Sequence, residues 1–470
     1  MGTISSAFSM ISQALDADQS ALSIVANNVA NASTTGYTEE TPNFQENQSI
    51  EINGVSYGSG VTSTGSTSVR DRVLEERLNQ QQQLASASGT RMTALDTLQA
   101  LFTPASGTTT STAGDIGTDI TSFFSSFSSL EANPSDNALR QKVLSTATTL
   151  AGDISSAAAS INSQKSALNQ ETSAVTSQVN ALTTSIAQLN QQIETTSPNA
   201  DAGTLEDQRQ QDLSQLSKLI GINQVTTENN GLSITTTSGQ SLVSDGSSFQ
   251  LTTGTVNGVT HFFVGTTDVT AGLTSGGGAL GGYLTARDQD IPSAMTSLDQ
   301  LAYSVSTQVN ALNNAGTDLD GDTSNAGNIF SATAQVLGSA ASMSVVMTDP
   351  NHIAAAASGE GTGDNTNATA MARLASQSIV DGQTPTDFYS NFVTVLGSTV
   401  SAVQTENTAQ TASVTQLQTQ NDALSSVSLN DEASNMQKLE RSYQAASQVF
   451  SILNTIMASA LNLGDQTTVT

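Results

Sequence analysis

Few side chains in this sequence are of the types that perform chemistry. The chain has two histidines and no cysteine. His261 lies in a strand-like run beside two phenylalanines, and His352 follows an Asp-Pro pair. Neither histidine belongs to a Ser-His-Asp order or a zinc-protease motif, so both are expected to be surface or packed imidazoles. We therefore predict no catalytic residue, no cofactor and no thiolate metal site.

A cluster of aspartates gives the one pattern that resembles a metal site. Asp318, Asp320 and Asp322 have the spacing of the first ligands of a calcium-binding loop. The pattern then fails, because Thr323 stands where that loop needs glycine and Ile329 where it needs a bidentate glutamate. We predict a solvated loop here, with calcium binding as the alternative.

The glycines between Gly276 and Gly282 do not form a phosphate-binding loop. No lysine follows them, and no strand–loop–helix pattern surrounds them. We interpret this stretch as a flexible joint before a long helix.

The composition of the chain limits the classes of function that it could have. The 470 residues suffice for roughly two to four domains. The net charge of −28 argues against nucleic acid and against an anionic membrane surface. No apolar run reaches the length of a membrane span, and no lysine or arginine precedes Arg70, so a cleaved signal peptide is not expected. These features fit a cytoplasmic protein or one exported without a cleaved signal.

The last part of the chain has the heptad pattern of a helix that pairs with another helix. From Ser442 to Gly464 there is no charged residue, so the outer face of this helix suits close contact with neighbouring chains. Glu432 stands at one seam position. The apolar rows are Leu429, Met436, Tyr443, Phe450 and Met457, and then Leu439, Ala446, Leu453 and Ala460.

The start of the chain carries the matching pattern. Its apolar rows also have a step of seven, and Asp16 and Asp18 are the only charges before Glu39. Two such helices can pair as a coiled coil, which we prefer to packing on an ordinary core. The rows are Ile4, Ile11 and Val25, and then Phe8, Leu15, Leu22 and Val29.

The interior combines long helices with a β insert. A heptad coil runs from Ile161 to Ile193 and ends at Ser197-Pro198, after which Leu205 to Ile220 is expected to fold back as a partner helix. Asp136 is the predicted N-cap of the helix leading into this coil. Frequent turn signals between Val225 and Leu273 predict short antiparallel strands.

The expected fold is therefore mainly α with a β insert (α+β). It is elongated, with the N- and C-terminal helices paired as a coiled coil, a long helical-bundle stalk and a small antiparallel β region. The predicted domains are a terminal coiled coil (1–37 plus 429–470), a helical stalk (38–224 plus 276–330 and 341–428) and the β region (225–275).

Both ends resemble the bacterial flagellar axial proteins, which form the rod, the hook and the hook-associated segments. The N-terminal motif contains Asn27, Asn28, Asn31, Gly36 and Tyr37, and its C-terminal counterpart is MQKLERSYQAA at 436–446. The interior segments LEDQR (205–209), GQSLV (239–243), GGYL (281–284) and GDN (363–365) are similar to the hook-associated protein 1 family. The motif residues are expected to set the end of the first helix rather than to bind a ligand.

The resemblance implies a secreted subunit, passed unfolded through the flagellar type III export channel without a cleaved signal. It implies a ring of copies at the hook–filament junction, whose partners are the hook protein, the second hook–filament junction protein and an export chaperone. It implies no nucleic acid and no membrane insertion. The family often carries a sizeable outer β domain, and here only a remnant at 331–340 is left for it.

The assembly interface is predicted at the heptad residues of both ends. A flagellar hook or rod protein is the alternative of the same class, although such proteins should lack the Ile161 to Ile193 coil. A secreted enzyme or a calcium-binding module is the alternative of another class. The predicted interface residues are Ile4, Phe8, Ile11, Leu15, Leu22, Val25, Val29, Met436, Leu439, Tyr443, Phe450, Leu453 and Met457.

Overall fold

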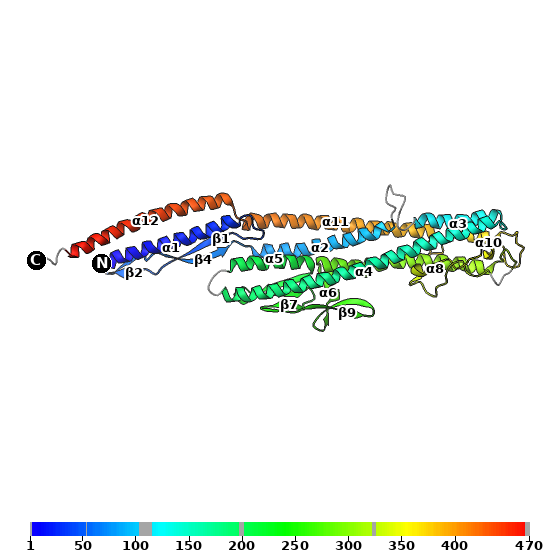
Figure 1. The fold of residues 1–470 in the computed structure, drawn as a ribbon, viewed down its shortest axis with the longest axis horizontal. Helices are drawn as coiled ribbons and strands as arrows, with labels where there is room; N and C mark the ends of the chain where they lie inside the picture. The colour runs from blue at the N-terminus through cyan, green and yellow to red at the C-terminus, as the bar shows by residue number, and fades with distance from the viewer. Residues whose placement is uncertain (1, 53, 103–114, 197–201, 322–325, 466–470) are drawn as a thin grey trace.

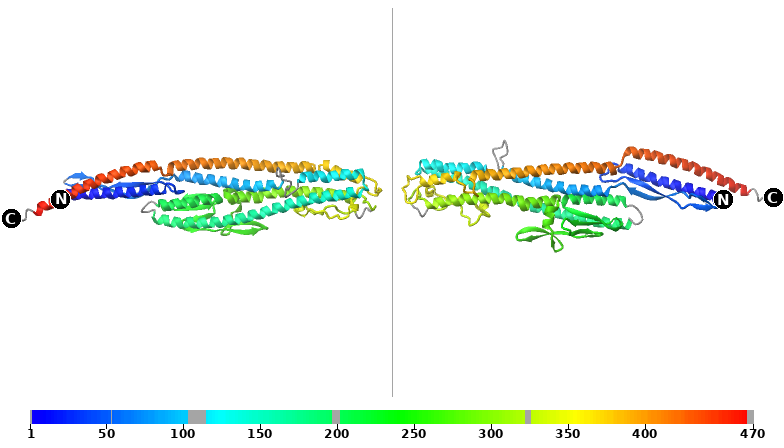
Figure 2. Two further views of the ribbon diagram at one scale, coloured as in Figure 1. Left: turned by 45° about the horizontal axis from the view of Figure 1, so that its top comes forward. Right: turned by 180° about the vertical axis from the view of Figure 1, so that it is seen from behind.

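The protein is a long, narrow rod of helices. The computed structural model describes residues 2–52, 54–102, 115–196, 202–321 and 326–465. Both chain termini lie at one end of the rod, and the chain folds back at the other end (Figure 1). The rod has a thin terminal part, which we call the terminal rod, and a thicker bundle, which we call the stalk (Figure 2).

The terminal rod consists of two helices and a β ribbon. Helix α1 (Gly2–Asn31) packs along α12 (Leu429–Asp465), so the first and last segments of the chain are neighbours. The ribbon packs on α1 as well. It is made of two antiparallel pairs, β1 (Glu40–Glu46) with β4 (Val61–Ser68), and β2 (Ile50–Ile52) with β3 (Val55–Tyr57).

Long helices run the length of the stalk. The longest, α4, has 60 residues, which corresponds to about 90 Å at the α-helical rise. Several helices begin at a side-chain N-cap: Asp71 accepts from the amides of Val73 and Leu74, and the predicted cap Asp136 accepts from that of Ala138. The stalk helices are α2 (Arg72–Ala100), α3 (Ile116–Ala132), α4 (Asn137–Thr196), α5 (Gly203–Leu219), α6 (Thr270–Gly276), α7 (Gly278–Thr285), α8 (Ile291–Ala315), α9 (Ser339–Ser342), α10 (Thr366–Arg373) and α11 (Pro385–Ser425).

The β region lies against the flank of α4. Its strands form a four-stranded sheet in the order β5-β6-β7-β8 and a three-stranded sheet in the order β11-β10-β9, with antiparallel neighbours throughout. The tight turns carry residues with positive φ, such as Asn257 and Gly258. The strands are β5 (Ile222–Thr226), β6 (Leu232–Thr236), β7 (Ser241–Ser244), β8 (Ser247–Ser248), β9 (Leu251–Val256), β10 (Val259–Val264) and β11 (Thr267–Asp268).

Two large apolar cores and a small cluster around Ile193 lie within the described part of the stalk. The larger lies far from the termini, where Phe123, Phe127 and Phe330 pack among α3, α4 and α8. The second joins α4 and α5 to the sheets through residues such as Val179 and Phe262. Among the described residues, no side chain of α1 or α12 belongs to either core. The terminal rod is therefore held by its own contacts and by the joint with the stalk.

The expected fold class is confirmed, and two local features differ from expectation. The glycines expected to form a flexible joint lie at the end of α6 and in α7. In α7, Gly282 packs so closely on α2 that an added Cβ would lie 2.2 Å from the carbonyl oxygen of Ala87. Close helix packing, which only glycine permits, explains this run. The last residues of the expected β stretch form α6, and the predicted break at Ser197-Pro198 lies outside the described residues.

A search of the described helices found none that is sufficiently long and apolar to span a membrane. The predicted domain boundaries, including the remnant at 331–340, stay a prediction. Ser339 and Ala340 of that remnant are buried, and the Asp299 carboxylate accepts hydrogen bonds from the amides of Gly338 and Ala340.

Candidate assembly site at the paired chain ends

Helices α1 and α12 run antiparallel along one seam. The rings of Phe8 and Phe450 meet with their centroids 4.6 Å apart, near the end of the rod that holds both termini. The half-buried residues of α12 recur with the predicted heptad spacing, as Leu439, Ala446 and Leu453 do. The heptads therefore place the two ends of the chain against each other.

The seam is only half-covered in a single chain. Of the predicted residues on α1, Val25 is buried, Val29 is 38% exposed, and the others are intermediate, namely Ile4, Phe8, Ile11, Leu15 and Leu22. On α12, Tyr443 is 39% exposed, and the others are intermediate, namely Met436, Leu439, Phe450, Leu453 and Met457. Apolar side chains left half-exposed are available for further burial by neighbouring molecules. Their role in assembly stays a prediction.

The Asn28 side chain connects α1 with α12 and β1 at the base of the terminal rod. Its side-chain amide donates to the Glu432 carboxylate (Nδ2 to Oε1, 3.0 Å) and to the carbonyl oxygen of Glu40 (2.8 Å). Its Oδ1 accepts from the Tyr37 hydroxyl at 2.8 Å and from the amide of Glu40 at 3.1 Å. One fully buried side chain thus ties α1 to α12 and to the start of the ribbon.

Glu432 is the charged residue that interrupts the predicted seam. It is 2% exposed, and within the described part of the chain its Oε2 has no hydrogen-bond partner. Its neighbours are acidic as well. Burial, followed by the nearby Glu432 and Asp431, raises the pKa of the Glu39 carboxyl. At this seam position, Glu432 therefore accepts a hydrogen bond from Asn28 instead of contributing to apolar packing.

The other motif residues shape the end of α1. Asn31 donates to the side-chain and main-chain oxygens of Asn27, at 2.8 and 3.0 Å. Gly36 has φ of +78°, and an added Cβ there would also meet the side chain of Gln211 on α5. Burial raises the pKa of Tyr37 to about 12, so its hydroxyl stays protonated and can donate to Asn28. Asn27 and Asn31 thus lie in the last turn of α1 and Gly36 in the turn that follows, whereas Asn28 and Tyr37 also connect separate elements.

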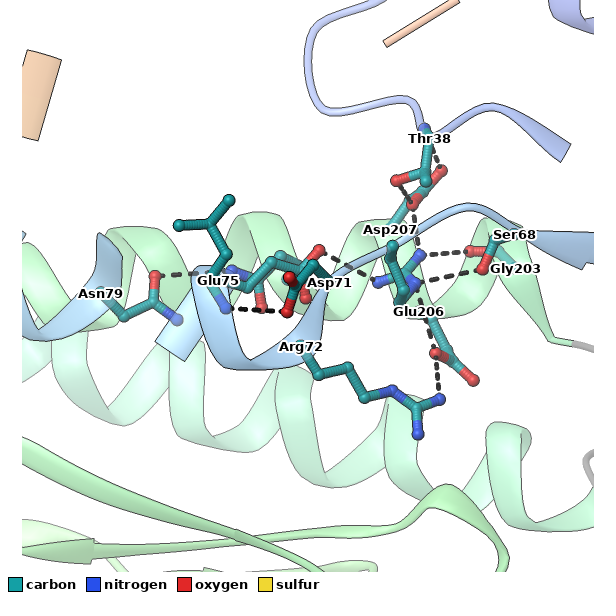
Figure 3. Close-up of polar contacts among 12 residues, drawn as sticks. Thr38, Ser68, Asp71, Arg72, Glu75, Asn79, Gly203, Glu206 and Asp207 are labelled. Atoms are coloured by element: carbon teal, nitrogen blue, oxygen red, sulfur yellow. Dashed lines mark hydrogen bonds and ion pairs between the residues drawn. The ribbon is translucent and has the colours of Figure 1, made fainter. Parts of the chain in front are cut away.

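A largely buried network of ion pairs lies where the terminal rod joins the stalk. We call it the joint cluster: Arg70, Arg72, Glu75, Glu206, Asp207 and Arg209. Arg70 lies 2.5 Å from Asp207 (Nη2 to Oδ1) and 3.5 Å from Glu206 (Nε to Oε2). Figure 3 shows Thr38, just before the ribbon, reaching Asp207, while Arg72 reaches Glu206. The cluster therefore connects the terminal rod to both α2 and α5.

Burial is the largest cause of the pKa shifts of Glu75, Asp207 and Arg209 in the joint cluster. It raises the pKa values of the Glu75 and Asp207 carboxyls, although Arg70 acts in the opposite direction. It lowers the pKa of Arg209 to about 10, which leaves that guanidinium charged at neutral pH. Arg209 donates to the Asn190 side chain at 2.9 Å and to the carbonyl oxygen of Asn230 at 2.5 Å, so the network extends to the β region.

A polar groove of about 600 Å³ lies beside the joint. It is lined by the end of α1 and the following loop, by α2 and α5, and by the last turns of α11. Its walls carry amides and hydroxyls, including Gln82, Gln211 and Asn421, together with the charged side chains of Asp207 and Lys218.

The residues considered for chemistry lie elsewhere. The ring of His261 pairs with Asp268 at 2.6 Å at the edge of the β10–β11 pair. Ligand atoms of Asp318, Asp320 and His352 lie within 4.8 Å of one another, and the Asp318 carboxylate accepts from the amide of Asp320 at 3.0 Å. Asp322 lies outside the described residues. A solvated loop stays the prediction here, with calcium binding as the alternative.

Sequence reasoning missed the joint cluster and the role of Glu432. A signal was present, because a chain with only 13 basic residues places Arg70 and Arg72 two positions apart and Arg209 beside two acids.

Comparison with known proteins identifies this architecture. Residues 105–330 match the family model of the flagellar hook-associated protein FlgK helical domain, and residues 12–38 match that of the flagella basal body rod protein. The paired ends and the rod-type segment define the chain as a flagellar axial protein. Within that class, it belongs to the flagellar hook-associated protein 1 family. The family is structural and flagellar, so the chain is not an enzyme.

The similarity extends over nearly the whole chain. Flagellar hook-associated protein 1 of Salmonella typhimurium is 24% identical over 549 residues, covering 96% of this chain and 98% of the relative. The Escherichia coli protein is 25% identical with the same coverage, and the Bacillus subtilis protein is 26% identical, covering 96% of both. In fold, the chain is similar to the flagellar hook junction protein FlgK from Burkholderia pseudomallei. That match has a TM-score of 0.65 and 20% identity, and it covers 75% of this chain and 100% of that one.

Proposed function

We propose that this protein is a non-catalytic structural subunit that joins the flagellar hook to the filament as a ring of copies. The observation that carries the proposal is the terminal rod, in which both chain ends form one extended seam that remains half-exposed in a single molecule. The absence of charge on α12 from Ser442 to Gly464 fits burial between neighbours. The near full-length similarity to hook-associated protein 1 relatives supports the same role.

The partners follow from this position. One end of the ring would meet the hook protein, and the other would meet the second hook–filament junction protein. The subunit would leave the cell unfolded through the flagellar export channel, accompanied before export by a chaperone. A chain without cysteine suits this route, because it can pass between compartments without forming disulfides.

Removal of the terminal partner helix tests the proposal. Deletion of residues 430–470 takes away one side of the seam, so filaments should no longer assemble on hooks, as seen by electron microscopy. Leu337→Ser serves as a control, because that side chain is 74% exposed and lies away from the terminal rod, so filaments should form normally. An antibody against the chain, applied to culture medium and cells, separates loss of export from loss of assembly. Normal filaments on the deletion strain would refute the proposal.

The coil distinguishes a junction protein from a hook or rod protein. The Ile161 to Ile193 segment is part of the single helix α4, and we expect hook and rod proteins to lack such a coil. Its presence favours the hook-associated assignment over that alternative.

A further inference from the structure

The hairpin formed by β2 and β3 has an apolar face that nothing covers among the described residues. Ile50 pairs with Tyr57 in this hairpin, and Val55 lies two positions before Tyr57 on the same strand. Cross-strand partners and alternate residues share a face, so these three side chains lie together. Ile50 and Tyr57 are each 46% exposed, and Val55 is 52% exposed. Glu51 and Ser56, which also pair, make the other face polar.

Helix α12 carries a second open apolar stripe, distinct from its seam. Val449, Ile452 and Ile456 follow helical spacing and are 42%, 59% and 46% exposed. At 100° per residue, they lie about 100–160° around the helix from Phe450, which faces α1. The stripe therefore points away from α1.

The two open faces lie at the same height on the terminal rod. Asn47 donates to the side chain of Gln13 on α1 at 2.8 Å, so the hairpin that follows extends beyond Gln13 toward the start of α1. The Phe8–Phe450 contact puts the stripe residues at that same end. Figure 1 places β2 beside the N-terminus, at the end of the rod where α12 also ends.

The two faces also lie on different sides of α1. Gln13 and Ser20, one heptad apart, bond to the ribbon residues Asn47 and Ser63. Phe8 precedes Gln13 by five residues, which turns it about 140° around the helix, and it contacts α12. In Figure 1 and in the right-hand view of Figure 2, α1 lies between α12 and the ribbon. A molecule of this shape offers one apolar face to each of two neighbours.

We propose that the β2–β3 hairpin of one copy docks, through Ile50, Val55 and Tyr57, on the Val449, Ile452 and Ile456 stripe of α12 in the adjacent copy. This inference rests on the proposed function, since it specifies the contact that repeats around the ring. A surface that binds a different surface of the next copy generates a closed ring when the rotation closes. The stripe carries no charge, so the fit is apolar.

The small size of both faces has a consequence for assembly. A few side chains per face bury less area than the roughly 800 Å² per partner of a stable interface. Free chains should therefore remain monomeric, and the contact should form where the hook end holds the copies side by side.

Site-directed cross-linking tests this contact, and the chain is suited to it because it has no cysteine. The full-length variant Val55→Cys/Ile456→Cys is expressed in place of the natural chain, and isolated hook–filament assemblies are treated with a short bismaleimide. We expect a ladder of covalent dimers, trimers and larger species on a denaturing gel. Either single cysteine variant should give no ladder, because equivalent residues do not meet in a heterologous contact.

The matched control is Ser56→Cys/Ile456→Cys, which moves one thiol to the polar face of the same hairpin. It should cross-link at least about fivefold less, because alternate strand residues point to opposite faces. Equal ladders from both double variants, or cross-links confined within single chains, would overturn the docking while leaving the ring subunit in place. Absence of the protein from isolated flagella would overturn the proposed function and the docking together. Circular dichroism and normal filament formation verify that each variant folds.

Discussion

At the scale of single residues, one amide holds the base of the terminal rod. Asn28 satisfies main-chain groups of Glu40, the Tyr37 hydroxyl and the Glu432 carboxylate from a fully buried position. Replacement by alanine would leave these groups buried without a partner, at a cost of about 1–3 kcal/mol. The motif was visible in the sequence, but a partner such as Glu432, 404 positions away, was not.

Asn28→Ala should therefore loosen the joint. Hydrogen exchange followed by mass spectrometry should show faster exchange in residues 28–40 and 429–436 than in the natural chain. Asn27→Ala is the matched control, since Asn27 directly precedes Asn28 on the same helix and its side chain is exposed. Equal exchange in the two variants would mean that the Asn28 bonds do not hold the joint.

A second residue-scale prediction concerns Asp119 in the stalk. Burial, a hydrogen bond with the Asp153 side chain and nearby acidic charges raise the pKa of Asp119 from 3.8 to about 7. Between these values the folded chain binds a proton that the unfolded chain has lost, so stability falls as pH rises through this window. After allowance for solvent screening, the effect is about 1–2 kcal/mol.

Thermal unfolding at two pH values tests whether stability falls as pH rises. The midpoint should be higher at about pH 5.5 than at about pH 8, and Asp119→Asn should reduce the difference by raising the midpoint at the higher pH. Asp96→Asn, a substitution of another stalk aspartate, which lies exposed on α2, controls for the general loss of negative charge. A pH dependence unchanged by Asp119→Asn would contradict the assignment.

At the scale of elements, the contact of α7 with α2 depends on a glycine. A Cβ on Gly282 would lie 2.1 Å from Thr90 Oγ1 and 2.2 Å from the carbonyl oxygen of Ala87. Because backbone atoms cannot move aside locally, Gly282→Ala should separate the helices and destabilise the stalk by about 1–3 kcal/mol or more. Gly152→Ala on α4 is the control: it has open space around it, and it should stabilise its helix by about 0.5–1 kcal/mol. Thermal midpoints that move in the same direction would refute this explanation.

The same glycines show where sequence reasoning succeeds and fails for elements. Apolar periodicity located α1, α4, α8 and α12, because a repeated spacing is a local property of the chain. Turn signals located the β region for the same reason. The run from Gly276 to Gly282 was wrongly predicted to be a flexible joint, because the close neighbour that requires glycine is distant in sequence. The joint cluster was missed because it combines segments more than 100 residues apart.

At the scale of the whole molecule, the joint cluster should decide how straight the rod is. Arg70 is almost fully enclosed and is shared among Glu75, Glu206 and Asp207. Arg70→Ala would leave these acids buried without their cation, at a cost of about 3–5 kcal/mol. The terminal rod should then bend relative to the stalk, and small-angle X-ray scattering should report a shorter maximum dimension.

Arg72→Ala is the matched control for this variant. The Arg72 side chain is 50% exposed, so the loss of its pair with Glu206 should cost at most about 1 kcal/mol and leave the scattering curve unchanged. Identical scattering from both variants would show that the joint is kept straight by other contacts.

The placement of both termini at one end of the rod has a practical consequence for labelling. A fluorescent protein or affinity tag fused to either terminus would sit at the proposed assembly surface of α1 and α12. The opposite end of the stalk, near α10, lies farthest from both termini (Figure 1). Gly361 and Gly363 in the loop before α10 have open space around them. An epitope inserted in that loop would report the position of the subunit along the flagellum while leaving the proposed assembly surface free.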